Sequence, residues 1–180
     1  MPREIAKLLD DIVLLPGETL ESVREFRRAL ARDLQPASSI EWILLCNFGD
    51  ITRETRFYRD LRNSLLDAAR REVVEQCLKD RPDQQHDLEF QFLGARQQSL
   101  DWQANPEKRK HIEQQIAKAG YTHGFVAAQG YERCAGEIET IERRLTELDA
   151  RRFATLRELK SVNAIFAQKL RATSNQLLEN

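Results

Sequence analysis

Apolar residues in the last third of the chain recur at alternating steps of three and four. The run is Ile138, Ile141, Leu145, Leu148, Arg152, Thr155, Leu159, Val162 and Phe166. This spacing places one stripe along a single α-helix, predicted over 136–178, and turns the stripe toward a partner helix. The stripe becomes polar at Arg152 and Thr155, which is typical of a position that sets the register of two helices.

A second long helix is predicted over residues 40–79. Ser38 and Glu41 form a capping-box pattern at its start. The predicted inward face of this helix consists of Ile40, Leu44, Asn47, Ile51, Thr55, Tyr58, Leu61, Leu65, Ala69 and Val73. Three aromatic residues lie off this face, so we expect the helix to contact neighbours on more than one side. They are Trp42, Phe48 and Phe57.

Shorter helices are predicted around the two long ones. Thr19 is a suitable N-cap for a helix over 19–34, and Asn105 followed by proline opens a helix that ends near Gly120. Residues 88–100 are predicted as a further short helix.

A last short helix is predicted to begin near Thr122 and to merge into the long C-terminal helix. Its glycines, at positions 124, 130 and 136, lie beside alanines and favour close helix approach or a break in the helix. If the chain has a hinge, we expect it around 120–136.

The sequence thus predicts an all-α fold in one domain, in which two long antiparallel helices form a coiled-coil-like pair and smaller helices pack on them. If the long helices are centred on each other, the numbers of facing residues sum to about 217. This register predicts an ion pair of Arg151 or Arg152 with Asp60 or Asp67.

Composition changes this picture little. Charged residues make up 32% of the 180 residues, and the net charge of −1 indicates no bulk attraction to nucleic acid or to an anionic membrane. No apolar run approaches the roughly 20 residues that span a bilayer, and the N-terminus lacks the pattern of a signal peptide. The three cysteines are widely spaced, as in reduced cytoplasmic proteins. We therefore expect a cytoplasmic protein.

Two groups of basic residues are candidates for contacts with an anion or a nucleic acid. They are Arg53, Arg56, Arg59 and Arg62 in the first long helix, and Lys108, Arg109 and Lys110 at the start of a later helix. Asp50, Glu54, Asp60 and Asp67 share the first helix. These carboxylates favour a balanced, solvated face over a phosphate-binding surface.

Metal and catalytic motifs are not found in the sequence. Cys77 with His86 and His123 with Cys134 are the nearest pairs of metal-ligand residue types, and neither has the spacing of a zinc motif. There is no nucleophile elbow, glycine-rich phosphate loop or H-E-x-x-H motif. We therefore expect no metal, no cofactor and no enzymatic activity, and we predict that Cys77 and Cys134 are partly buried thiols.

Two parts of the chain resemble a group of uncharacterised bacterial proteins. The matching segments are Leu15-Pro16-Gly17-Glu18 with Pro36, Glu41 and Trp42, and Ala150-Arg151-Arg152 with Leu156-Arg157-Glu158. The resemblance implies a bacterial cytoplasmic protein, and it carries no activity, cofactor or site residue.

The leading hypothesis is a non-enzymatic helical interaction or scaffold protein. Trp42, Phe48 and Phe57 cannot all face the partner stripe, so the apolar surface that remains predicts self-association as a homodimer. The alternative is a nucleic-acid-associated protein that uses the two basic groups. An enzyme with an unrecognised carboxylate or thiol site is the third hypothesis.

Overall fold

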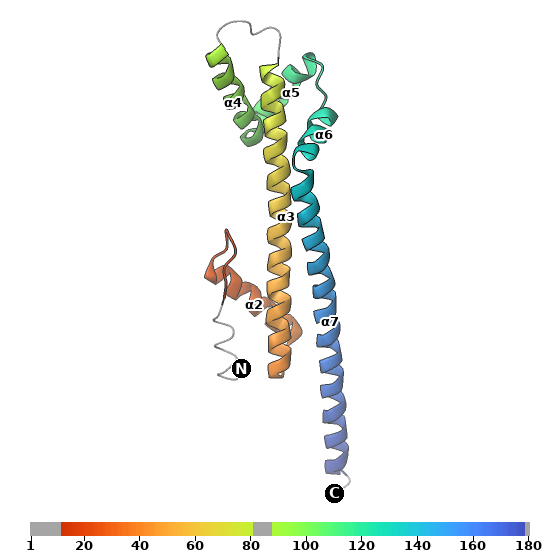
Figure 1. Cartoon of the computed structure of the whole chain (residues 1–180). Coiled ribbons are helices and arrows are strands. Elements are labelled where there is room, and N and C mark those ends of the chain that lie inside the picture. Colours follow the sequence, from red (N-terminus) through yellow and green to blue (C-terminus); the bar gives the residue numbers. More distant parts are fainter. Residues whose placement is uncertain (1–11, 81–87, 179–180) are drawn as a thin grey trace. The chain divides into compact units, whose positions relative to one another are not determined.

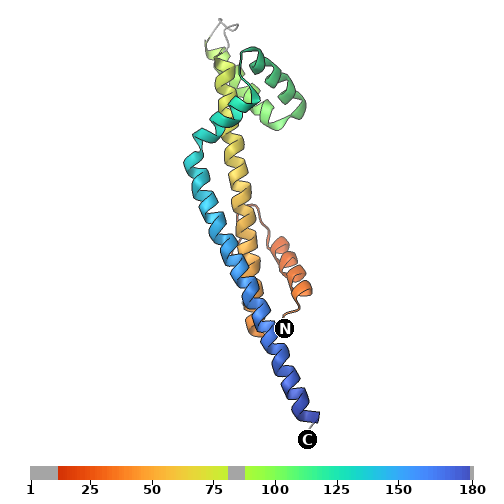
Figure 2. The same cartoon turned by 90° about the vertical axis from the view of Figure 1, so that its right-hand side faces the viewer.

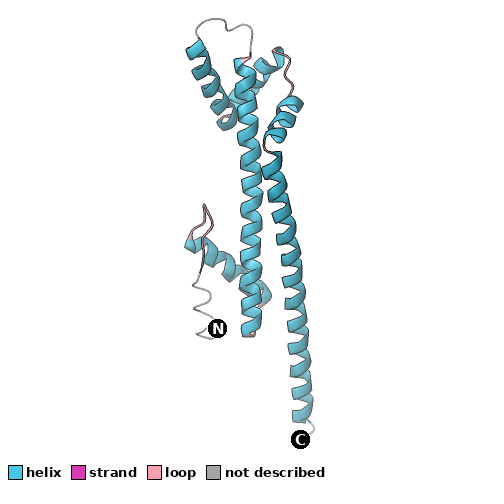
Figure 3. Ribbon diagram, viewed as in Figure 1, coloured by secondary structure: helices cyan, strands magenta, loops and turns pink. Residues whose placement is uncertain are grey.

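Every regular element among the residues that the computed structural model describes is an α-helix. The structure describes residues 12–80 and 88–178, with side chains for 12–80 and 94–164. The helices are α2 (Leu20–Leu34), α3 (Ser39–Lys79), α4 (Leu88–Ala104), α5 (Pro106–Lys118), α6 (His123–Arg133) and α7 (Ala135–Leu178) (Figures 1 and 3). The predicted all-α class is confirmed. Within these ranges, no helix is long and apolar enough to cross a membrane.

The chain divides into two compact units, which are described separately. Unit 1 joins the residues up to Arg59 to those from Arg143 onward, and unit 2 is the stretch Asp60–Glu142. Unit 1 therefore holds α2 with parts of α3 and α7, whereas unit 2 holds α4, α5 and α6 with the remaining parts of α3 and α7.

The predicted helix starts agree with the structure. The Thr19 side chain accepts a hydrogen bond from the backbone N–H of Ser22, and the Ser22 side chain accepts one from Thr19 in return. At the start of α3, Ser38 and Glu41 form the predicted capping box, with 3.0 Å between the Ser38 nitrogen and Glu41 Oε2. Asn105 caps α5, whose first residue is a proline.

The predicted hinge region contains two interruptions of the helices. Gly120 has a φ of +91°, a left-handed conformation that suits glycine after the end of α5. Cys134 separates α6 from α7, so the expected merger of these two helices is wrong. Motion at this region stays a prediction.

The stripe on α7 is buried between Ile138 and Leu159, apart from Arg152, as its spacing predicts. Val162 is half-buried, and the side chain of Phe166 lies outside the described residues. The buried members are Ile138, Ile141, Leu145, Leu148, Thr155 and Leu159. Leu148 has no exposed surface, and Arg152, where the stripe turns polar, is half-buried. Burying each large side chain contributes roughly 1.5–3 kcal/mol, so this stripe is a major source of stability for α7.

The predicted inward face of α3 is wrong over its first turns. Ile40 is 59% exposed and Asn47 is also exposed, whereas Leu45 is completely buried. In unit 1, α2 packs against the face that carries Leu45 and Gly49, and a Cβ built on Gly49 would lie 3.3 Å from Leu30 of α2. From Ile51 onward the predicted face is buried or half-buried.

The core of unit 2 surrounds the last turns of α3. It consists of Val73, Val74, Cys77, Leu78, Ala95, Trp102, Ile112, Ile116 and Val126. Successive residues of α3 are buried on both faces because α4, α5 and α6 lie around this end of the helix (Figures 1 and 2).

The centred register of α3 and α7 is also wrong. That register placed Arg62 opposite about residue 155 and Arg59 opposite about residue 158. In unit 2, Arg62 pairs instead with Glu142 at 2.7 Å, and in unit 1 Arg59 lies 4.0 Å from Asp149. The displacement is roughly two to four helical turns.

The reason for the displaced register lies in unit 2. There α6 lies against α3 near Arg70 and Glu72, since Gly130 meets Arg70 and Arg133 pairs with Glu72. The first turn of α7 reaches α3 only near Ala69, where Ile138 packs. In unit 1, Arg152 forms its ion pair with Asp149 on its own helix at 3.0 Å.

Gly130 allows a close approach of α6 to α3. A Cβ at this position would lie 2.8 Å from Cγ of Arg70 and 3.2 Å from the Cα and backbone nitrogen of the same residue. Backbone atoms cannot move aside as the far end of a flexible side chain can, so a larger residue here would force a small shift between the two helices. The expected close packing is confirmed at Gly130. A Cβ at Gly136 would instead have no atom of a neighbouring element within 4 Å.

We predict that Gly130→Ala destabilises the protein by about 1–2 kcal/mol. Overpacking costs about 1–3 kcal/mol, and alanine's better helix propensity offsets up to about 1 kcal/mol of it. Urea unfolding followed by circular dichroism measures the difference. Gly136→Ala is the matched control and should be neutral or stabilising, so an equal effect of both substitutions would contradict the packing argument.

Candidate functional site

Arg53 is the centre of a network of charged side chains in unit 1. Its guanidinium has two contacts with the Glu18 carboxylate, one of them 2.8 Å from Nε to Oε1. It also donates to Asp50 at 2.9 Å and to the carbonyl oxygen of Val13 at 2.8 Å. Arg27 pairs with the same Asp50 at 3.0 Å. Through its bonds to Glu18 and Val13, Arg53 holds the segment before α2 on α3. Its side chain is only 9% exposed, so it is not available to an external phosphate.

The turn before α2 presents Glu18 to this arginine. Pro16 and Gly17 form the turn, Gly17 has a φ of +84°, and the Glu18 nitrogen donates to the Leu15 carbonyl at 3.0 Å. The Glu18 carboxylate accepts a hydrogen bond from the Leu15 nitrogen in return. The hydrogen bonds from Arg53 lower the pKa of Glu18 from its ordinary value, against an opposing effect of burial.

The other arginines of the predicted basic band also face carboxylates of their own chain. Arg59 approaches Asp149 and Arg62 pairs with Glu142. The positive charge of Arg56 acts on Glu18. These arrangements agree with the balanced face that the sequence favours over a phosphate-binding surface.

The second basic group lies where α4 meets α5 in unit 2. Lys108 pairs with Asp101 at 2.8 Å, and this hydrogen bond lowers the pKa of Asp101. Arg109 donates to the backbone carbonyl oxygens of Trp102 and Gln103, and its guanidinium lies 5.1 Å from the centre of the Trp102 ring. Lys110 is exposed. Two of the three residues therefore stabilise the junction of the two helices.

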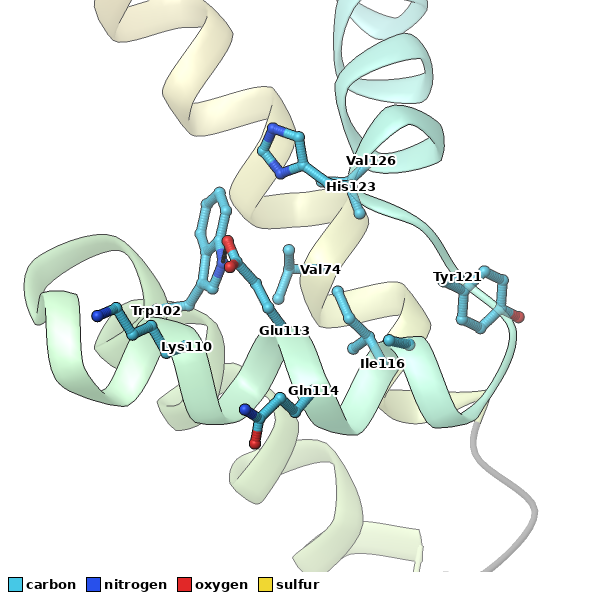
Figure 4. A pocket seen from close by; sticks show the side chains of 10 residues that line it. Val74, Trp102, Lys110, Glu113, Gln114, Ile116, Tyr121, His123 and Val126 are labelled. Atoms are coloured by element: carbon cyan, nitrogen blue, oxygen red, sulfur yellow. Dashed lines mark hydrogen bonds between the residues drawn. The ribbon is translucent and has the colours of Figure 1, made fainter.

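A cavity of about 380 Å³ opens beside this junction in unit 2 (Figure 4). Its lining comes from α3, α4, α5 and the start of α6, and consists of Val74, Trp102, Lys110, Glu113, Gln114, Ile116, Ala117, Tyr121, His123 and Val126. The Trp102 indole N–H donates to Glu113 Oε1 at 3.2 Å. A largely apolar floor with a few convergent polar groups is typical of a ligand site.

Sequence reasoning did not identify this cavity. Trp102 and Glu113 are 11 positions apart and lie on different helices, and they meet only because the turn at Asn105 folds α5 back on α4. The asparagine–proline pair indicated that turn, but no sequence signal gives the angle between the two helices.

Two of the three cysteines are buried. Cys77 and Cys134 are buried free thiols, and burial raises the pKa of Cys77. A raised pKa keeps the thiol protonated and unreactive at neutral pH. His86 lies outside the described residues. In the part of the chain that is described, no three His, Cys, Asp or Glu residues form a group that could hold a metal ion.

We predict that Glu18→Gln lowers the free energy of unfolding by about 1–2 kcal/mol at neutral pH, because it removes a charged hydrogen-bond partner of Arg53. The folded-state pKa of Glu18 lies below the ordinary value of 4.5. Its contribution is therefore complete above that pH and disappears as the pH falls through the folded-state pKa. Urea midpoints of the two proteins should converge in acid.

Glu21→Gln is the matched control for this prediction. Glu21 is exposed and pairs with Arg28 on the surface of α2, so its loss should change the midpoint little. Equal effects of the two substitutions at neutral pH, or a gap for Glu18→Gln that persists in strong acid, would contradict the role of the network.

No protein-family model, curated protein or solved structure matches this chain. The resemblance of its two parts to a bacterial group therefore stays a prediction.

Proposed function

We propose that this chain is a non-enzymatic helical interaction protein of the cytoplasm that forms a homodimer through the last turns of α7. The observation that carries the proposal is that, within unit 1, α7 continues past the first turn of α3 (Figures 1 and 2). The free cysteines, of which two are buried, support a reducing compartment.

The contacts of unit 1 give the length of this projecting part. Arg59 approaches Asp149, and Arg144 lies 3.5 Å from Glu54. With equal rise on two helices of opposite direction, these contacts place Ser39, the first residue of α3, beside a position of α7 between about 159 and 169. Roughly ten to twenty residues of α7 then extend beyond α3.

The sequence of the projecting part continues the apolar stripe of α7. Val162, Phe166, Leu170 and Leu177 follow Leu159 at helical steps, with Thr173 between the last two. An isolated helix of this length is only marginally stable in water unless its apolar stripe is buried. The stripe therefore favours a second helix along it.

The partner that we propose for this stripe is the same segment of a second copy. If two such segments run antiparallel, each packs along the stripe of the other. Each segment then lies in line with the α3 helix of the other chain. The two chains make identical contacts because they are related by twofold symmetry. The C-terminal end of each α7 then approaches the N-terminal end of an α3, an arrangement that the two helix dipoles favour. Ile40 and Ile43, which are exposed near that end of α3, extend the apolar surface that such a dimer covers.

The arginine contacts favour this function over the nucleic-acid alternative. Arg53, Arg59 and Arg62 already face carboxylates, and Lys108 pairs with Asp101. A phosphate would have to compete with these intramolecular partners.

We predict a dimer that Phe166→Glu disrupts. Burial of a phenylalanine contributes roughly 1.5–3 kcal/mol and each dimer would bury two, so the substitution should weaken dimerisation by about a hundredfold or more. Sedimentation equilibrium over a range of protein concentrations measures the association constant. A wild-type protein that remains a strict monomer at high micromolar concentration would overturn the proposal.

Gln168→Glu is the matched control. It adds the same charge to the same segment, on a residue off the stripe, and should leave the dimer intact. Lys169 and Arg171 bring like charges together in the dimer, so added salt should strengthen self-association. Binding to nucleic acid would instead weaken steeply with salt. Equal loss of dimer in both variants would contradict the stripe as the interface.

A further inference from the structure

The cavity of unit 2 combines a fixed aromatic ring with a carboxylate. Trp102 is 6% exposed, and its indole N–H is bonded to Glu113. Arg109, which donates to the Trp102 carbonyl oxygen, stacks on the same ring. The ring and the carboxylate are therefore held in place before any ligand arrives.

The remaining walls of the cavity are largely apolar. Val74, Ile116 and Val126 belong to the buried core of unit 2 and also line the cavity. Figure 4 shows the Glu113 carboxylate beside the Trp102 indole and next to Val74. A ligand that reaches this carboxylate thus has its remaining atoms against hydrocarbon.

Glu113 is the acidic residue among those that line the cavity. The Trp102 bond occupies Oε1 of Glu113, so the second carboxylate oxygen remains able to accept a hydrogen bond from a ligand. Lys110 also lines the cavity, but Figure 4 shows its ammonium directed away from the Glu113 carboxylate. His123 and Gln114 also line the cavity, and Tyr121 packs against the core of unit 2.

We propose that this cavity binds an ammonium group carried on a short apolar stem, such as an alkylamine or a lysine side chain. The ammonium donates to Glu113 and lies near the Trp102 ring, and the stem packs on Val74 and Ile116. A carboxylate recognises an ammonium group by a charged hydrogen bond, and the edge of the Trp102 ring gives its stem a further apolar contact. An anion in the same place would meet the charge of Glu113.

The selectivity of the wild-type chain tests the proposal directly. We expect n-butylammonium to shift the indole N–H resonance of Trp102 in a saturable way, at constant ionic strength, whereas butanol and butyrate of the same stem length do not. The two tryptophan signals are distinguished with Trp42→Phe. A shift that does not saturate with n-butylammonium, or one that butyrate or butanol reproduces, would overturn the proposal.

Two matched variants extend the test. Glu113→Gln retains the size of the side chain and an oxygen that can accept from Trp102, and it should weaken n-butylammonium binding about tenfold or more. Glu107→Gln makes the same charge change on an exposed residue of α5 that does not line the cavity, and should leave binding unchanged. Equal binding by the Glu113 variant and the control would refute the role of that carboxylate, and the selectivity of the wild-type protein decides the matter if the variant does not fold.

Nα-Acetyl-lysine amide separates the two sources of the ammonium group. If it shifts the Trp102 resonance at lower concentration than n-butylammonium, the cavity receives a lysine of another protein. If n-butylammonium is bound more tightly, the site is one for a free amine. Failure of both probes to bind would overturn the proposal.

Discussion

Leu145 and Leu148 lie one turn apart on α7, and both are almost completely removed from water. Backbone hydrogen bonds alone do not stabilise a helix such as α7, because a helix fully exposed to water has little free-energy advantage over the unfolded chain. The burial of this one stripe stabilises α7 within both units. In unit 1, α2 packs on another face of α3, and the sequence of α7 beyond the start of α3 continues the apolar pattern of the stripe.

Electrostatics refine this arrangement. The Arg53 network fixes the turn that precedes α2, and it does so with a guanidinium that is nearly buried and bonded to two carboxylates and a carbonyl oxygen. Such geometry gives orientation more than net stability, because the desolvation of the charges offsets much of their attraction. The same pairing removes Arg53 from the surface, and separate carboxylates face Arg59 and Arg62.

Sequence reasoning predicted the helices well and their arrangement only in part. Caps such as Thr19 and Asn105 act within a few residues, so their chemistry is visible in the sequence. The stripe of α7 could also be predicted from the sequence, because its members share one face of the helix and therefore recur at one regular spacing. The face of α3 changes along its length, toward α2 near Leu45 and toward α4, α5 and α6 near Val74, and no single period describes such a helix. The register failed because it assumed centred helices, whereas α6 occupies the side of α3 near Arg70. The cavity could not be predicted because it depends on the angle between α4 and α5.

Hydrogen–deuterium exchange at several protein concentrations tests most directly whether the end of α7 is an interface. Amides of residues 145–159, whose stripe is covered within the chain, should exchange slowly and equally at every concentration. Amides of residues 166–178 should become more protected as the concentration rises, because the second copy covers them only in the dimer. Exchange in this last segment that does not change with concentration, while the protein passes from monomer to dimer, would contradict the account.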